Sequence, residues 1–319
     1  MMSDIPVLDF GQICLRKETN NWFSGNASRQ LADKLYKAFS TVGFVYIKNH
    51  GIPQEKIASI FKLSDDFFQL DHDVKQKYAR PASGCGHGWV AFEREKVSPD
   101  RPADHKEAFN ITEPCNDQRV WPDDKVPGFQ KEIHSFFELC GQLSLHILHL
   151  MALGLELKDA EIFTDTHKTM ESTKNATTLR LLHYPCIKEE DGIKPGQIRC
   201  GEHTDYGSIT LLFQDEMPGL EVLPLGCEDY IPAPPLPGAI VVNVADLMQR
   251  WTADKLKSTR HRVSIPTEEC HRRVPRRSLA FFVHPDDDTL VECLDGSEKY
   301  SSITAYDYLW QRLNATYEY

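Results

Sequence analysis

The sequence has no uninterrupted apolar run of about 18 residues, the length that a membrane-spanning helix needs. It also has no Cys-X-X-Cys pair among its nine cysteines, and its first four residues lack the basic and apolar segments of a signal peptide. An odd number of scattered cysteines fits reduced thiols better than a disulfide framework. We therefore expect a cytoplasmic protein without a membrane partner.

Positive charge is scarce. Lys and Arg number 36 against 47 Asp and Glu, which gives a formal net charge of −11. A protein that binds a nucleic-acid polymer gains most of its affinity from basic side chains that neutralise phosphates, so we expect no such partner. Residues 271–277 form the one strongly basic run. We expect Arg272, Arg273 and Arg277 in it to be solvated.

Helical periodicity marks three segments in the first half of the chain. Apolar residues recur at helical spacing over 28–40, from Pro53 to Phe68, and from Gly128 to Gly154. His146 and His149 lie on the third of these helices at a spacing that would suit a metal pair. Because their neighbours are apolar and no acidic partner is near, a scaffold helix is the favoured interpretation.

From about residue 177 the pattern changes to short apolar and β-branched runs separated by Gly and Pro. The candidate strands are 178–184, 197–203, 208–213, 220–223, 239–244, 258–264 and 278–283. This number of strands is enough for a jelly roll. Asp246 is expected to cap a short helix over 247–251. The predicted fold is mainly β with α additions, in a chain of 319 residues that forms a single globular unit.

The residues most suited to chemistry are His203-Thr204-Asp205 and, further along the chain, His261. Residues two apart on a strand project to the same side, so one short segment can supply both His203 and Asp205. With His261 from another strand, they would form the 2-His-1-carboxylate set that leaves one face of a non-haem Fe(II) open. His-X-Asp alone is a weak signal, and a third feature is needed.

That feature is Arg276-Arg277-Ser278, which leads into an apolar strand. Arg276 and Ser278 would point the same way along the strand, and a guanidinium can donate two hydrogen bonds to one carboxylate. Arg277 should face the other way.

With these motifs the chain resembles the isopenicillin-N-synthase-like branch of the Fe(II)/2-oxoglutarate-dependent dioxygenases, closest to fungal thymine-7-hydroxylase-like members. The likeness extends over nearly the whole chain. Its further motifs are Ile5-Pro6-Val7-Leu8-Asp9-Phe10, Gly43-Phe44-Val45-Tyr46-Ile47-Lys48-Asn49-His50-Gly51, Lys106-Glu107-Ala108-Phe109 and Leu182-His183-Tyr184-Pro185. None of the early motifs reports chemistry, and His50 is expected to be a packed or capping side chain.

The resemblance implies a double-stranded β-helix (jelly-roll) core with an N-terminal mixed or helical region and a C-terminal helix. Its parts would be an N-terminal region (5–125), a scaffold helix and connection (126–176), the core (177–290) and a C-terminal extension (291–319). It also implies Fe(II) on His203, Asp205 and His261, with 2-oxoglutarate and O2 as cosubstrates. Arg276 and Ser278, assisted by Tyr184, would hold the distal carboxylate of 2-oxoglutarate.

The resemblance places a small-molecule substrate between Tyr206 and Phe282, near Arg180. Two aromatic faces and a cation would favour a heteroaromatic or anionic compound. An asparagine that binds the base in thymine-7-hydroxylase-like relatives falls at Gly86, so we expect weak or absent thymine oxidation.

The expected reaction is hydroxylation of a small molecule with release of succinate and CO2. Two alternatives stay open at this stage. One is an iron oxidase that uses the same site without 2-oxoglutarate, and the other is a non-catalytic ligand-binding protein of the same fold. Succinate production separates the three.

Overall fold

The computed structural model describes residues 5–11, 26–81, 86–98, 100–116, 118–187 and 192–317, so the first four residues lie outside it. The strands are β1 (Val7–Asp9), β2 (Phe44–Lys48), β3 (Gly88–Val90), β4 (Glu107–Ile111), β5 (Thr178–Tyr184), β6 (Cys200–His203), β7 (Ile209–Gln214), β8 (Leu220–Val222), β9 (Ile231–Pro232), β10 (Ala239–Val244), β11 (His261–Val263), β12 (Arg276–Val283), β13 (Leu290–Val291) and β14 (Ile303–Thr304). The helices are α1 (Asn26–Thr41), α2 (Gln54–Phe68), α3 (His72–Lys75), α4 (Phe129–Gly154), α5 (Ile162–Asp165), α6 (Asp246–Trp251), α7 (Glu269–Arg272) and α8 (Ala305–Tyr317), with 3-10 turns η1 (Gln76–Tyr78) and η2 (Pro122–Asp124).

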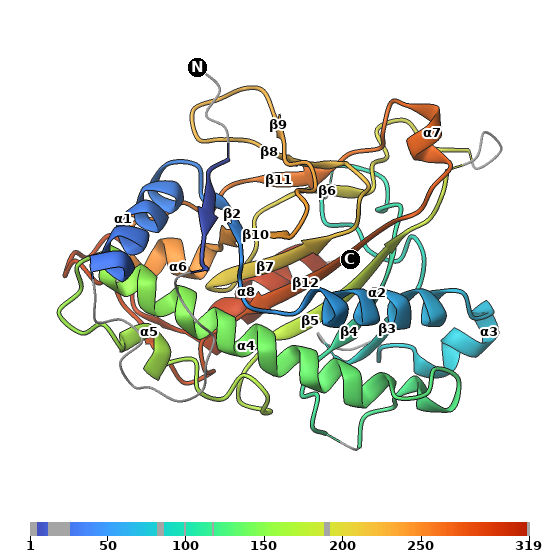
Figure 1. Ribbon diagram of the computed structural model, residues 1–319, viewed down its shortest axis with the longest axis horizontal. Coiled ribbons are helices and arrows are strands. Elements are labelled where there is room, and N and C mark those ends of the chain that lie inside the picture. Colours follow the sequence, from blue (N-terminus) through green and yellow to red (C-terminus); the bar gives the residue numbers. More distant parts are fainter. Residues whose placement is uncertain are drawn as a thin grey trace.

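Two sheets form the centre of the molecule. The larger has eight strands in the order β1-β2-β10-β7-β12-β5-β4-β3, and the smaller has four in the order β6-β11-β8-β9. Successive strands from β5 to β8 alternate between the larger and the smaller sheet. This alternation is the jelly-roll arrangement, so the predicted double-stranded β-helix core is confirmed. In Figure 1 the smaller sheet lies above β7 and β12.

The larger sheet is buried on both faces, and β12 shows how its sequence separates them. Leu279 and Phe281 belong to the core cluster that includes the helices. Ser278, Ala280 and Phe282 line a cavity bounded by both sheets. Because side chains alternate along a strand, one segment supplies the packed core and the cavity wall at once.

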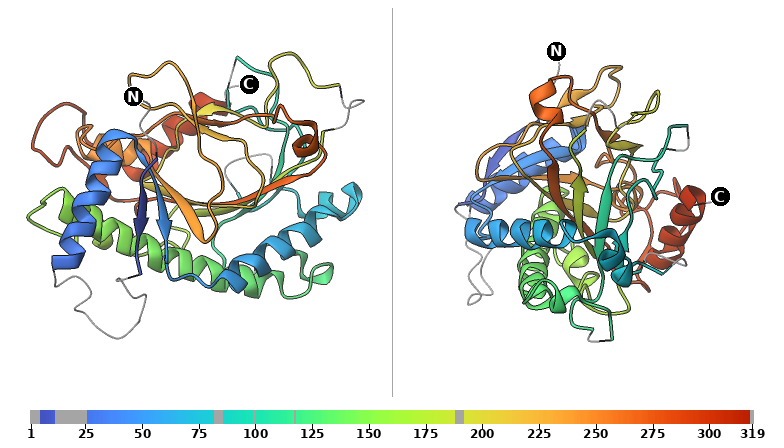
Figure 2. Two further views of the ribbon diagram at one scale, coloured as in Figure 1. Left: turned by 45° about the horizontal axis from the view of Figure 1, so that its top comes forward. Right: turned by 90° about the vertical axis from the view of Figure 1, so that its right-hand side faces the viewer.

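Helices cover the outer face of the larger sheet. α4 contacts β7 and β12, α2 contacts β12, and α1 contacts β2. Figures 1 and 2 show α2 and α4 running along the same side of the sheet. By length and composition α4 could cross a membrane, but 67% of its most apolar window is buried inside the protein. The expectation of a scaffold helix for 128–154 is therefore confirmed, but the expectation that no acidic partner is near is wrong, because His149 Nδ1 lies 3.0 Å from Glu161 Oε1.

The predicted helices match α1, α2 and α4, whereas two predicted strands are too long. The strand predicted over 197–203 begins at Cys200, because the Gln197 backbone N–H bonds to the carbonyl of Lys194 in a turn. The strand predicted over 258–264 is only β11, because the Ser258 backbone N–H bonds to the side chain of Gln249. In both segments, backbone groups are thus bonded outside the ladder before the strand begins.

Two side-chain roles also differ from expectation. Asp246 does not cap α6, because the N-cap residue is Ala245 and makes no side-chain cap bond. The Asp246 carboxylate instead accepts from the Thr204 hydroxyl at 2.9 Å and pairs with Arg312 at 3.0 Å. Arg277 is not simply solvated either, because it pairs with Asp65 and Asp215 on the side of the sheet away from the cavity. Arg272 and Arg273 are exposed, as predicted.

Candidate active site

His203, Asp205 and His261 lie together at the edge of the smaller sheet. His203 ends β6 and His261 begins β11, and the two residues are register partners in this antiparallel pair. The Nε2 atoms of both histidines lie 3.7 Å from Asp205 Oδ1. Strand pairing therefore brings together ligands that are far apart in the sequence.

Backbone carbonyls orient both imidazoles. His203 Nδ1 lies 2.8 Å from the carbonyl oxygen of Gly201, and His261 Nδ1 lies 3.1 Å from that of Thr259. A carbonyl accepts only, so each Nδ1 carries the proton that it donates. Each Nε2 is left with its lone pair facing Asp205, as a metal ligand requires.

Two neighbours fix the carboxylate of Asp205. Its Oδ2 accepts from the Thr210 hydroxyl at 2.6 Å and from the Asn243 amide at 2.8 Å. Oδ1 is the oxygen that faces the histidines. Oδ2 is therefore held in place by hydrogen bonds, and Oδ1 is available to a cation.

Electrostatics give these groups the charges that a metal site needs. Burial, together with the nearby His261, lowers the pKa of His203 to about 3. Burial alone would raise the pKa of Asp205, but His261, His203 and the bonds from Asn243 and Thr210 hold it below its ordinary value. At neutral pH His203 is thus neutral and Asp205 is an anion. Two imidazoles and one carboxylate suit a divalent transition metal with open positions.

Arg276, Ser278 and Tyr184 form the second predicted group. Arg276 on β12 is the register partner of Tyr184 on β5, and its guanidinium lies 5.1 Å from the tyrosine ring centre. Arg276 Nη1 lies 3.4 Å from the Ser278 hydroxyl, and Nη2 donates to Gln214 Oε1 at 2.7 Å. All three predicted residues line the same cavity as the histidines and Asp205.

This end of the cavity is strongly positive. Arg276 is 1% exposed and has no ion-pair partner among the described residues. Arg199 is fully buried nearby, and burial together with the charge of Arg276 lowers its pKa to about 10. Buried guanidinium groups without a carboxylate are costly, so the arrangement favours an anionic ligand.

The cavity has a volume of about 440 Å³ and runs between the two sheets to α8. Arg180, Tyr206 and Phe282, the predicted substrate residues, all line it. Arg180 has a partner that the sequence did not predict, because its Nη2 donates to Glu95. Tyr206 is covered by the guanidinium of Arg312 at 4.8 Å. Their contact with a substrate stays a prediction.

Sequence reasoning missed several residues of this site. Asn243 leaves a detectable signal, because it is the one amide in the apolar run of β10 and is buried there. Gln214 ends β7 beside Arg276 and could be found once the strand register is known. Glu95 lies in an irregular segment and has no sequence signal.

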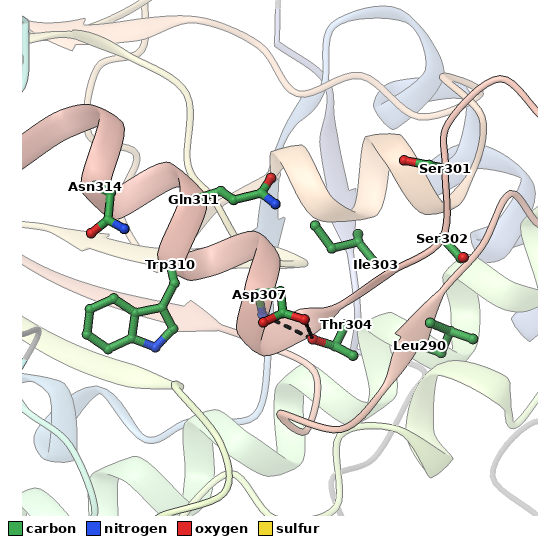
Figure 3. Close-up of a pocket in the computed structure, with 9 residues that line it drawn as sticks. All are labelled: Leu290, Ser301, Ser302, Ile303, Thr304, Asp307, Trp310, Gln311 and Asn314. Carbon is green, nitrogen blue, oxygen red and sulfur yellow. Dashed lines mark hydrogen bonds between the residues drawn. The ribbon is translucent and has the colours of Figure 1, made fainter.

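The other candidate sites of the described residues are more exposed than the His203–Asp205–His261 group. Two further groups of potential ligands lie at least partly exposed, namely Cys115, His134 and Glu171, and Glu268, Cys270 and His271. Figure 3 shows a more open depression beside α8, where Asp307 and Thr304 bond to each other and start the helix. It contains no part of the His203–Asp205–His261 group.

Comparison with known proteins agrees with this geometry. Residues 176–285 match the 2OG-Fe(II) oxygenase superfamily, and residues 5–138 match the N-terminal region described as non-haem dioxygenase in morphine synthesis. A proline hydroxylase of Petromyces alliaceus is 35% identical over 89% of this chain and 92% of the relative. A 2-oxoglutarate-Fe(II) type oxidoreductase of Metarhizium rileyi is 34% identical over 98% and 91%.

Solved structures point the same way. A full-length Neurospora crassa protein, crystallised in complex with alpha-KG and thymine, superposes with a TM-score of 0.84 at 33% identity, covering 98% of this chain and 97% of the other. The chain belongs to the 2OG-Fe(II) oxygenase superfamily and is an iron- and 2-oxoglutarate-dependent oxidoreductase. Fe(II), 2-oxoglutarate and O2 are accordingly its cofactor and cosubstrates, and its relatives bind small molecules.

Proposed function

We propose that His203, Asp205 and His261 hold Fe(II), and that Arg276, Ser278 and Tyr184 hold the distal carboxylate of 2-oxoglutarate. The observation that carries this proposal is the convergence of two Nε2 atoms on Asp205 Oδ1, each 3.7 Å away. When bound, Fe(II) and 2-oxoglutarate would, together with O2, supply oxidative decarboxylation to succinate and CO2 coupled to oxygenation of a C–H bond.

The protein contributes binding and orientation. Thr210 and Asn243 hold Asp205 in place, so the carboxylate does not need to reorganise when the metal enters. Arg276 lies deep in the cavity, which fixes the direction in which a dicarboxylate can enter. Both sheets contribute walls to the cavity, and Asp205 and His261 are buried in it.

For the second substrate we propose a small molecule that is heteroaromatic or anionic. Tyr206 and Phe282 supply aromatic surfaces to the cavity that also holds Arg180. Thymine itself fits less well, because Gly86 stands on the cavity wall without a side chain to bond to the base. A Cβ atom placed there would meet only Pro81, at 3.7 Å. We expect little or no thymine oxidation.

The test is an anaerobic titration with Fe(II) and 2-oxoglutarate that follows the visible charge-transfer band of the chelate. Asp205→Ala removes the only anionic ligand, and we expect loss of the band and of succinate formation with the fold retained. Asp229→Ala changes an exposed aspartate between β8 and β9 and serves as the control. Full succinate formation by the Asp205 variant would refute the proposed iron site.

The same assay addresses the oxidase alternative. An oxidase that does not need 2-oxoglutarate would consume O2 and its substrate without releasing succinate. We expect one succinate for each turnover of 2-oxoglutarate.

A further inference from the structure

Buried oxygen atoms without partners gather on the cavity wall contributed by β4 and its neighbours. Glu95 Oε1, Asn110 Oδ1 and Thr112 Oγ1 have no hydrogen-bond partner among the described residues. All three residues line the cavity that contains the proposed iron ligands. Buried polar atoms are nearly always bonded, and leaving one without a partner destabilises a protein. These atoms are therefore candidates for contact with a ligand.

Strand register places these acceptors beside Arg180. Asn110 on β4 is the direct partner of Arg180 on β5, and Ala280 on β12 is the partner of Arg180 on its other side. Opposed residues on neighbouring strands project to the same face. Thr112 follows β4 by one residue and lines the same wall. A ligand that reaches Arg180 would therefore also meet groups that accept hydrogen bonds.

Glu95 supplies the negative charge of this wall. It is 4% exposed, and its Oε2 accepts from Arg180 Nη2 and lies 3.7 Å from Lys106 Nζ. Lys106 Nζ also lies 2.5 Å from Asp104 Oδ2. Burial would raise the pKa of Glu95, but Arg180 and Lys106 outweigh it and lower the pKa to about 2. Glu95 is thus an anion with one oxygen bound to Arg180 and the other unbonded.

We propose that the substrate is an amino acid or a closely related zwitterion, with its ammonium group on Glu95 Oε1 and its carboxylate on Arg180. This inference rests on the function proposed above. A zwitterion would extend the Glu95–Arg180 ion pair into a ring of alternating charges. Within the anionic class proposed above, a compound that also carries an ammonium group would be preferred, because Glu95 is a buried anion on the wall that it shares with Arg180.

Asn110 and Thr112 would provide further acceptors for the ammonium group. An ammonium group has three N–H donors, and one bond to Glu95 leaves two donors to be satisfied. Asn110 Oδ1 and Thr112 Oγ1 are acceptors on the same wall. These two residues would set the selectivity for a primary or secondary amine over a quaternary one.

The experiment compares compounds that differ in one charge. Purified protein with Fe(II) and 2-oxoglutarate is assayed for succinate release with each of the twenty proteinogenic amino acids. The best of them is then compared with its N-acetyl derivative, its carboxamide and thymine. Because each modification removes one charge-assisted hydrogen bond, we expect kcat/KM to fall about tenfold or more for either derivative. Equal rates with the N-acetyl derivative would overturn the proposal.

Variants test the residues themselves. Glu95→Gln should lower kcat/KM for the amino acid by about tenfold or more and leave the KM for 2-oxoglutarate unchanged. Thr112→Val keeps the shape of the side chain and the charge of the wall, and should lower kcat/KM severalfold even if Glu95→Gln folds poorly. Glu113→Gln is the matched control, because Glu113 also lines the cavity but is bonded to Arg119 and Asn116. Unchanged kinetics in Thr112→Val, or an equal loss in Glu113→Gln, would contradict the assignment.

Binding without turnover separates the two proposals. Under anaerobic conditions the amino acid should raise the Tm of wild-type protein and raise it much less in Thr112→Val. If no compound yields succinate but this shift is seen, the proposed function fails and the zwitterion site stands. If thymine yields succinate and no amino acid binds, the function stands and the zwitterion site is wrong.

Discussion

Arg276 and Arg277 are adjacent on β12 but face opposite sides of the sheet. Arg276 lines the cavity and bonds to Gln214, whereas Arg277 pairs with Asp65 and Asp215 on the helix-covered side. The two arginines differ in what surrounds them and hardly at all in sequence context. This difference gives a test with an internal control.

We expect Arg276→Lys to raise the KM for 2-oxoglutarate about tenfold or more, because lysine keeps the charge but cannot donate two parallel hydrogen bonds to a carboxylate. Arg277→Lys should change this KM less than about twofold, since its side chain lies on the side of the sheet away from the cavity. Steady-state kinetics with varied 2-oxoglutarate make the comparison. If both variants show the same KM, the assigned strand register is wrong.

Asn243 bonds the proposed iron ligand Asp205, so we expect it to affect iron binding through that carboxylate. We expect Asn243→Leu to weaken Fe(II) binding about 10- to 100-fold, because the carboxylate keeps only its bond from Thr210. Circular dichroism should show a retained fold. Asn49→Gly removes an amide that bonds an exposed aspartate, Asp9, and suits the positive φ of residue 49, so it is the control. An Asn243 variant that binds iron as tightly as wild type would show that Thr210 alone orients Asp205.

At the scale of elements, α8 is a helix that borders the cavity between the two sheets. Thr304 and Asp307 bond to each other at its start, which stabilises the first turn. Leu309, Trp310 and Leu313 line the cavity. The helix is tied down by Arg312, which pairs with Asp246 at 3.0 Å and covers Tyr206.

Loosening α8 should affect the second substrate more than 2-oxoglutarate. We expect Arg312→Ala to raise the KM for the second substrate severalfold, because it removes the ion pair to Asp246 and the stacking on Tyr206 together. The KM for 2-oxoglutarate should change by less than about twofold. Losing one partly exposed ion pair should have little effect on distant parts of the protein. Arg29→Ala, which removes a similar surface ion pair from α1, is the control. Equal effects on both KM values would contradict a local role for α8.

At the scale of the whole molecule, the proposed ligands come from strands that are distant in sequence. Binding of metal and 2-oxoglutarate should therefore stabilise both sheets together. At a hundred times the Kd, one ligand adds about 2.7 kcal/mol to the free energy of unfolding. For a chain of this size we expect each ligand to raise the Tm by about 4 °C in differential scanning fluorimetry.

The same measurement distinguishes the two ligands. Mn²⁺ can replace Fe(II) to avoid oxidation, and its shift should persist in Arg276→Lys while the further shift from 2-oxoglutarate shrinks. In Asp205→Ala the metal shift should disappear. A full 2-oxoglutarate shift in Arg276→Lys would place the distal carboxylate elsewhere.

The sequence was sufficient for features that depend on local pattern. Helical spacing predicted α1, α2 and α4, because an amphipathic helix carries its own period. His203, Asp205 and His261 were recognisable because few residue combinations suit an open metal site, and Arg276 and Ser278 because strand alternation fixes their common side. Strand ends were less predictable, since distant side chains such as Gln249 stop the ladders.

Only the tertiary structure decided which side chains meet across strands. The chain alone determined the two-residue alternation that sends Arg180 to the cavity and Leu181 to the core. It did not determine that Glu95, from an irregular segment, would neutralise Arg180, or that Asn243 would bond Asp205. Such contacts depend on the register between strands and on the path of loops. Both are set by the packing of the whole molecule, because no local pattern encodes the distance between residues far apart in sequence.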